Sequence, residues 1–150
     1  MGNSDLTLDK QVCFALYSAS RAVTQLYRPV LDSLGLTYPQ YLVLIVLWER
    51  GPTTVKDLGT ALRLDSGTLS PLLKRLESAG LVARERRAED ERSVRVRLTD
   101  KGDELRGRAC VVPGRIAGAS GMDLAELEEL RQRLVELTEA VGKHTLAPLD

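Results

Sequence analysis

The stretch from residue 54 to residue 98 limits the possible folds of this chain more than any other. A short helical pattern ends at residue 62, and a three-residue turn separates it from a second helical pattern over 66–79. Helix, three-residue turn and helix is the spacing of a helix-turn-helix. After Gly80 the apolar residues recur at every second position, as they do in strands. We therefore predict a helix-turn-helix followed by a β-hairpin.

The second of these predicted helices has two different sides. Its apolar stripe comes at helical spacing and consists of Leu69, Leu72, Leu73 and Leu76. A rotation of about 100° per residue puts small and basic residues on the other side; they are Gly67, Thr68, Pro71, Lys74, Arg75 and Ser78. Pro71 removes one helical hydrogen bond, so a helix that begins at Ser70 is an alternative.

Further helices are predicted on both sides. Apolar residues at three- and four-residue spacing predict a helix over 8–34, which Pro29 should end or bend. Thr37 and Gln40 predict a capped start for an apolar core helix over 38–50. A helix from residue 100, loosened around 113–121, precedes a last helix over 124–141 that Asp123 and Glu126 cap.

Composition excludes several classes of protein. A chain of 150 residues with 43% hydrophobic and 28% charged residues has room for one globular domain. Its net charge of zero excludes a wholly basic nucleic-acid coat protein. The apolar run over 41–48 is far too short for a membrane span, which needs about 20 residues. No secretory signal is evident at the N-terminus, so we expect a cytoplasmic protein without membrane contact.

The reactive residues exclude most enzyme classes. The single histidine, His144, lies near the C-terminus, and the two cysteines, Cys13 and Cys110, are far apart. A histidine-ligated metal site, a Ser-His-Asp triad and a Cys-His dyad each lack a member. No glycine-rich nucleotide loop is present. We therefore expect no metal, no cofactor and no enzyme, which leaves binding or thiol chemistry.

Positive charge gathers on the helix-turn-helix and the hairpin. Residues 74–97 hold eight basic and five acidic residues, a net charge of +3, and residues 123–139 carry −4. A local basic patch is the electrostatic footprint of a DNA-binding protein. The second helix would enter the major groove, and an arginine of the hairpin tip the adjacent minor groove. A solvated hairpin surface is the alternative, but the helix-turn-helix spacing favours DNA.

Four segments, 65–77, 80–82, 90–94 and 98–99, resemble the MarR family of winged helix-turn-helix repressors. The resemblance covers roughly residues 8–141 and implies a mainly helical homodimer with a small β-hairpin wing. It implies that Arg92 is the minor-groove arginine of the wing tip and Asp90 its carboxylate partner. The other DNA-binding residues that we expect are Ser66, Thr68, Ser70, Lys74, Arg75 and Arg86.

The same resemblance implies one MarR-type domain over 1–150. Within it, 8–50 would hold dimerisation and sensor helices, 54–98 the winged helix-turn-helix, and 100–145 the C-terminal dimerisation helices. The partners implied are a second copy of the chain and double-stranded DNA with a palindromic operator.

A second cluster is formed by aromatic residues and a thiol. All six aromatic residues fall between positions 14 and 48, and Cys13 and Tyr17 share one helical face. Tyrosine hydroxyls that donate to a sulfur favour its ionised form, which a peroxide oxidises to a sulfenic acid. The alternative is that Cys13 is a small core hydrophobe, as free cysteines often are.

The segments 9–17, 27–29 and 36–41 are similar to the organic hydroperoxide sensors (OhrR) of the MarR family. This similarity implies that an organic hydroperoxide oxidises Cys13 and that the repressor then releases its operator. It also implies that Tyr27 and Tyr38 of the other protomer hydrogen-bond the Cys13 sulfur, with Tyr17 close by.

Two questions stay open at this point. Such sensors complete their oxidation either with a second cysteine or with a low-molecular-weight thiol; Cys110 is the candidate second thiol, but we expect it to be a packed helical cysteine. The function also has alternatives: a MarR-type repressor released by a phenolic or other small ligand, with Cys13 structural, or a thiol peroxidase.

The wing assignment makes a testable prediction. Arg92→Ala should weaken operator binding, because a contact in the narrow groove is lost, and should lower the salt dependence by about one phosphate equivalent. Binding titrations at several salt concentrations measure both quantities. An unchanged affinity would contradict the assignment.

Overall fold

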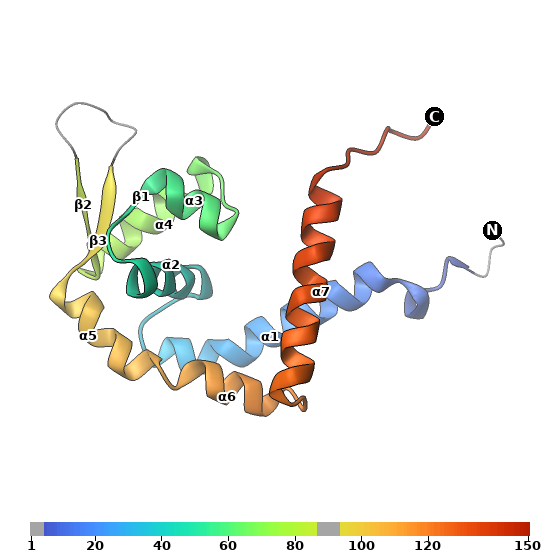
Figure 1. Ribbon diagram of the computed structural model, residues 1–150, viewed down its shortest axis with the longest axis horizontal. Helices are drawn as coiled ribbons and strands as arrows, with labels where there is room; N and C mark the ends of the chain where they lie inside the picture. The colour runs from blue at the N-terminus through green and yellow to red at the C-terminus, as the bar shows by residue number, and fades with distance from the viewer. Residues whose placement is uncertain (1–4, 87–93) are drawn as a thin grey trace. The chain divides into compact units, whose positions relative to one another are not determined.

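The computed structural model of this chain describes residues 5–86 and 94–150. The helices and strands in chain order are a 3₁₀ turn η2 (Leu8–Lys10), α1 (Val12–Asp32), α2 (Tyr38–Arg50), β1 (Thr53–Thr54), α3 (Val55–Leu62), α4 (Ser66–Ser78), β2 (Val82–Glu85), β3 (Arg95–Leu98), α5 (Asp100–Ala109), α6 (Val112–Ala119) and α7 (Leu124–Gly142) (Figure 1). The chain divides into two compact units, Met1–Cys110 and Val111–Asp150. The fold is a mainly helical winged helix-turn-helix, as the sequence predicts.

The sheet has three antiparallel strands in the order β1-β3-β2. The predicted hairpin pairs Val82 with Leu98 and Glu85 with Arg95. The third strand, β1, was not predicted; Thr53 pairs with Val96 and is buried there. A strand of two residues shows no alternation, so the sequence carries no period by which it could be recognised.

The core of the first unit lies between α2, α3, α4 and the sheet. In α2, Val43, Leu44 and Leu47 are almost fully buried, which confirms the predicted core helix. All four leucines of the predicted stripe of α4 are buried as well. Leu58 of α3 and Val96 of β3 are fully buried in the same core. Burying a leucine or valine side chain contributes roughly 1.5–3 kcal/mol, so this core supplies most of the favourable free energy of the unit.

Side-chain caps set the starts of these helices. Thr37 and Gln40 form the predicted capping box at the start of α2. Asp65 accepts a hydrogen bond from the Thr68 amide at 2.7 Å, so α4 starts at Ser66 and the alternative start at Ser70 is wrong. The four first amides of a helix lack partners within it, and a cap at Asp65 satisfies one of them.

The predictions differ from the structure at two other places. The helix α1 begins at Val12 rather than residue 8, and it continues for three residues beyond Pro29. Proline removes only its own amide from the helical ladder, so the turn after it can still form. The stretch predicted to be loose holds the helix α6, with Pro113 in its first turn, where a missing amide costs little.

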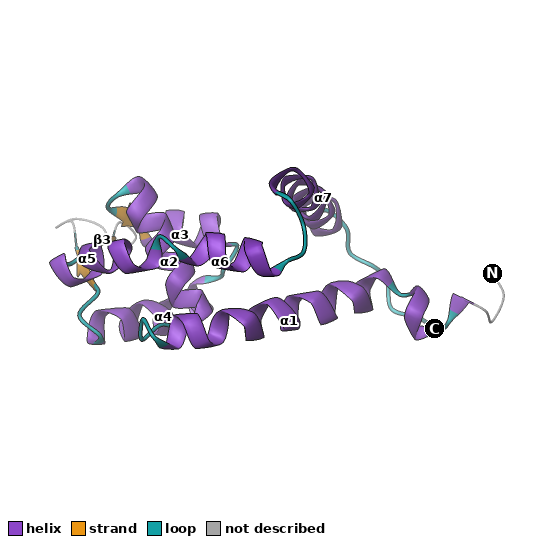
Figure 2. Ribbon diagram, turned by 90° about the horizontal axis from the view of Figure 1, so that it is seen from below, coloured by secondary structure: helices purple, strands orange, loops and turns teal. Residues whose placement is uncertain are grey.

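Two helices leave apolar residues exposed within their own units. Figure 2 shows α1 as one long, continuous helix, and Leu31 is its single buried residue. Val12, Phe14, Val23 and Leu26 are all more than a third exposed. In the second unit, α7 has a capping box of Asp123 and Glu126 and buries none of its residues. In the described part of the chain, no helix has the length and apolarity to cross a membrane.

Gly102 offers a direct test of the packing in the first unit. A Cβ on this residue would overlap the Leu81 carbonyl oxygen, which is backbone and cannot turn away. We expect Gly102→Ala to lower the free energy of unfolding by about 3 kcal/mol, as overpacking a tight contact does.

Gly107, on the same helix, is the matched control. A Cβ there meets no other atom within 4 Å. Gly107→Ala should therefore raise stability by about 0.5–1 kcal/mol, the difference in helix propensity. Urea denaturation followed by circular dichroism measures both variants, and equal effects would contradict the proposed contact.

Candidate functional site

The exposed side of α4 carries the residues predicted to meet DNA. Ser66, Thr68, Ser70, Lys74 and Arg75 are all exposed, while the leucines between them face the core. The hydrogen bond from the Thr68 amide lowers the pKa of Asp65, because it favours the carboxylate. The negative cap at the positive end of the helix dipole therefore holds the first turn of α4 in place.

The wing is described only in part. Arg86 is exposed directly after β2. Asp90 and Arg92, the predicted wing-tip residues, lie outside the described residues. Their assignment therefore stays a prediction.

Two arginines near the wing are paired with carboxylates. Arg84 donates from its backbone amide, Nε and Nη2 to the Glu77 carboxylate, each at 3.3 Å. These contacts lower the pKa of Glu77 and tie α4 to β2. Arg97 pairs with Glu85 across the two strands of the hairpin. All four residues belong to the stretch 74–97, and each pair has a net charge of zero. The net charge of +3 in this stretch therefore comes from its other residues.

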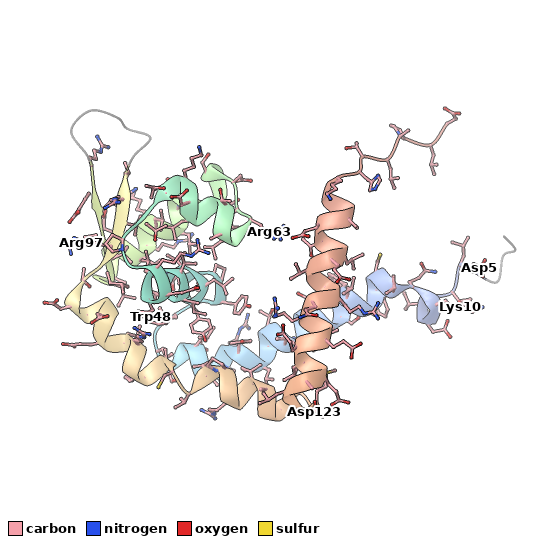
Figure 3. All side chains as sticks on the ribbon, in the orientation of Figure 1. Asp5, Lys10, Trp48, Arg63, Arg97 and Asp123 are labelled. Atoms are coloured by element: carbon pink, nitrogen blue, oxygen red, sulfur yellow. The ribbon has the colours of Figure 1, made fainter. Side chains whose placement is uncertain are left out.

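Two other cations lie close to the start of α4, and the sequence analysis missed both. Lys56 and Arg63 line a groove of about 880 Å³ between α3, α4 and β2, together with Arg84. Figure 3 labels Arg63. Arg63 has a left-handed backbone with φ 55°, which allows the Leu64 amide to reach the Gly59 carbonyl at 2.9 Å. Glycine is the usual residue at this position after a helix. Here the position is taken by Arg63, so the sequence has no glycine to mark the turn. The place of Arg63 in the groove is evident only from the structure.

Cys13 is the second residue of α1, and its side chain is exposed. It is therefore not a core residue of this chain. Tyr17, one turn further along, is exposed too, and its ring lies under the Arg21 guanidinium at 5.4 Å from the ring centre. The two residues share the first turns of α1, as their spacing predicts.

The other predicted tyrosines form a cluster where α1 ends and α2 begins. The ring centres of Tyr27 and Tyr38 are 4.9 Å apart. Tyr41 joins them at 6.0 Å from Tyr27 and 6.4 Å from Tyr38. Tyr41 is one of the six aromatic residues of the predicted cluster, but it was not predicted as a site residue, although its position three residues after Tyr38 on one helix is the signal for it. Burial raises the pKa of Tyr27 to about 12, and the neighbouring rings Tyr38 and Tyr41 add to the shift.

Cys13 and Tyr27 do not meet within one chain. They are fourteen residues apart on one helix, which at 1.5 Å per residue separates them by about 21 Å along its axis. The thiol and the phenols can form one site only if a second copy of the chain supplies one of them.

The comparisons with known proteins agree with one another. Residues 25–107 match the family model described as transcriptional regulator SarA/Rot. The chain is 48% identical to the organic hydroperoxide resistance transcriptional regulator of Bacillus subtilis, over 91% of this chain and 92% of that protein. The structure of reduced AbfR bound to DNA, a protein of Staphylococcus epidermidis, is similar with a TM-score of 0.81. It is 36% identical and covers 95% of this chain and 98% of that one. Disulfide-formed AbfR is similar with a TM-score of 0.62, at 39% identity over 91% and 90% of the two chains.

The chain belongs to the MarR family of transcriptional regulators. Within this family it is of the organic hydroperoxide regulator (OhrR) type. The family explains why a helix-turn-helix, a wing and long flanking helices occur together in so short a chain.

Cys110, the second thiol of this MarR-family chain, is exposed, so the prediction of a packed cysteine is wrong. Leu105 and Ala109 take the buried positions at this end of α5. The Cys110 Sγ donates to the Gly107 carbonyl at 3.1 Å. Among the described residues, no group of three or more His, Cys, Asp and Glu side chains is arranged to hold a metal ion.

The raised pKa of Tyr27 makes a prediction for alkaline solution. Its phenol should lose its proton near pH 12 rather than at its ordinary value of 10.0. Between these values the unfolded chain binds fewer protons than the folded one, so stability should fall as the pH rises from 10 to 12. A titration of phenolate absorbance in wild type and Tyr27→Phe measures the shift, and a Tyr27 component near 10 would contradict it.

Proposed function

We propose that this protein is a homodimeric DNA-binding repressor that releases its operator when an organic hydroperoxide oxidises Cys13. One observation carries the proposal. An exposed thiol starts α1, and a cluster of phenols ends it, in a chain 48% identical to an organic hydroperoxide resistance regulator.

The exposed side of α4 supports the DNA-binding part. Small residues such as Thr68 and Ser70 let the helix approach base edges, and Lys74 and Arg75 reach phosphates or guanines. The wing, with Arg86, Asp90 and Arg92, would lie along the adjacent minor groove. A related protein of known structure, AbfR, has been seen bound to DNA. A twofold dimer would read a palindromic operator.

The unburied face of α1 supports the dimer. If two copies of α1 run antiparallel, Cys13 of one lies level with Tyr27 of the other when residue 20 is at the crossing. Four of the five residues over 18–22 are small, namely Ser18, Ala19, Ser20 and Ala22, and Arg21 is the exception. Small side chains allow two helices to approach closely, and the exposed Val12 and Phe14 would be covered.

The chemistry that we propose is a two-electron oxidation of sulfur. The Cys13 thiolate attacks the terminal oxygen of the hydroperoxide, an S–O bond forms, and the O–O bond breaks. The alkoxide that leaves takes up a proton and becomes an alcohol, and Cys13 becomes a sulfenic acid. Tyr27 and Tyr38 of the partner subunit would donate hydrogen bonds to the thiolate and so favour the reactive form.

A second thiol then completes the oxidation. It attacks the sulfenic sulfur, a disulfide forms, and the hydroxyl group leaves as water. Cys110 is exposed and can take this role, and a low-molecular-weight thiol is the other candidate. Loss of the phenol hydrogen bonds would favour a dimer whose two recognition helices no longer fit successive major grooves. A bias of about 2.7 kcal/mol is sufficient to weaken DNA binding 100-fold.

A repressor released by a small ligand is the second candidate. A cavity of about 250 Å³ beside Tyr38, lined also by Arg28, Asp32 and Leu36, favours it. In that case Cys13 would be structural, and peroxide would leave the complex with DNA intact. A thiol peroxidase is distinguished by repeated turnover of peroxide, whereas a sensor consumes one equivalent per switching event.

Cys13→Ser separates these functions. We expect the variant to bind a duplex that the reduced wild type selects from a random pool, and to stay bound when cumene hydroperoxide is added. Gel-shift titrations with and without the peroxide measure the release. Cys110→Ser is the control for a non-specific thiol effect. In this variant peroxide should still oxidise the Cys13 thiol. If peroxide releases Cys13→Ser from DNA, the redox mechanism is wrong.

A further inference from the structure

The end of the recognition helix α4 is held by the start of α5. The carbonyl oxygens of Ala79, Gly80 and Leu81 follow α4 directly. They accept hydrogen bonds from Lys101 Nζ at 2.9 Å, Thr99 Oγ1 at 2.5 Å and the Thr99 amide at 3.1 Å. The last carbonyls of α4 itself are already satisfied by the amides of residues 79–81, so these three bonds fix the segment after the helix to a distant part of the chain.

The contact between these two segments leaves no free space. Gly102 follows Lys101 and is buried, and a Cβ on it would overlap the Leu81 carbonyl oxygen. Close-packed segments joined by three hydrogen bonds transmit displacement rather than absorb it. The first turn of α5 and the end of α4 therefore move together.

The side chain of Trp48 connects this junction to α2. Trp48 Nε1 donates a hydrogen bond to the Gly102 carbonyl at 3.0 Å (Figure 3). This bond joins residues that are 54 positions apart. The Trp48 ring also lies edge-on to Tyr41, with ring centres 6.5 Å apart and an angle of 66° between the planes. Edge-on aromatic pairs have a preferred geometry, so a shift of one ring displaces the other.

Tyr41 in turn contacts both phenols of the proposed sensor. It lies 6.0 Å from Tyr27 and 6.4 Å from Tyr38, and it is only 3% exposed. A buried ring has no solvent into which it can turn. The contacts therefore run without a gap from Tyr27 and Tyr38, through Tyr41 and Trp48, to Gly102 and the end of α4.

We propose that Trp48 is the positioning residue that couples the tyrosine cluster to the recognition helix, through its hydrogen bond to the Gly102 carbonyl. This inference rests on the proposed function, since it needs a chemical event at the phenols. When oxidation of Cys13 frees Tyr27 and Tyr38, Tyr41 and Trp48 change position. Trp48 then shifts the first turn of α5, and the three hydrogen bonds carry that shift to α4.

Trp48 reports on its own movement, because it is the single tryptophan of the chain. We expect its fluorescence emission to change when cumene hydroperoxide oxidises the full-length protein, and to stay constant in Cys13→Ser. Release of DNA by the wild type without any change in emission overturns the coupling and leaves the proposed function intact. Failure of peroxide to release the wild type from DNA overturns the proposed function itself.

Trp48→Phe tests the hydrogen bond, since it keeps a ring beside Tyr41 and removes the donor. We expect Cys13 to be oxidised at the wild-type rate and the reduced variant to bind DNA within about three-fold of wild type. The loss of affinity on oxidation should shrink by about ten-fold, within the usual range of coupling between sites. Thiol labelling and gel-shift titrations measure the two steps separately. If folded Trp48→Phe protein loses as much DNA affinity on oxidation as the wild type does, the inference is overturned.

Arg108→Met is the matched control. Arg108 also joins α5 to a distant main-chain carbonyl, that of Ser33, at 2.8 Å, but its bond does not lead to α4. We expect this variant to keep the full loss of DNA affinity on oxidation. An equal reduction in Arg108→Met and Trp48→Phe would show that any loosening of α5 has this effect, and would overturn the specific role of Trp48.

Discussion

The close approach of Gly102 to the Leu81 carbonyl is the contact on which the DNA-facing half of this molecule depends. Only a residue without a side chain allows the two backbones to lie this close. At this separation Thr99 and Lys101 reach the carbonyls that follow α4. Because Thr99 also follows β3 directly, the same junction sets the recognition helix and the wing relative to one core.

The rest of the first unit has a different physical character. The core around α2 and α4 is closed by its own leucines, and it needs no partner to be covered. The helix α1 buries almost nothing within its unit, and its thiol, Cys13, lies about four turns from Tyr27. A site that joins them is therefore a property of an assembly. Under the proposed function, this division would let the oxidation of Cys13 at one surface act on DNA binding at another, through the buried aromatic residues between them.

Much of the fold was predictable because it depends on local patterns. Thr37, Gln40 and Asp123 cap helices where they were expected, since a cap and the amide it satisfies are three residues apart. The alternation after Gly80 located the hairpin for the same reason. The misses have physical causes too: β1 is too short to show a period, and Pro29 was given more weight than the loss of one amide warrants.

Residue type and spacing were enough to pick out the candidate functional residues: Cys13, Tyr27, Tyr38 and the basic face of α4. Their relations to one another were not evident from these patterns. That Tyr41 joins the phenols, that Glu77 neutralises Arg84, and that Trp48 reaches Gly102 depend on contacts between elements. A pattern of neighbouring residues does not reveal such contacts. They form when helices pack, and the order of the helices along the chain does not give their distance in space. Secondary structure and core thus follow from short-range periodicity, whereas the contacts that join the tyrosine cluster to the end of α4 exist only in the packed molecule.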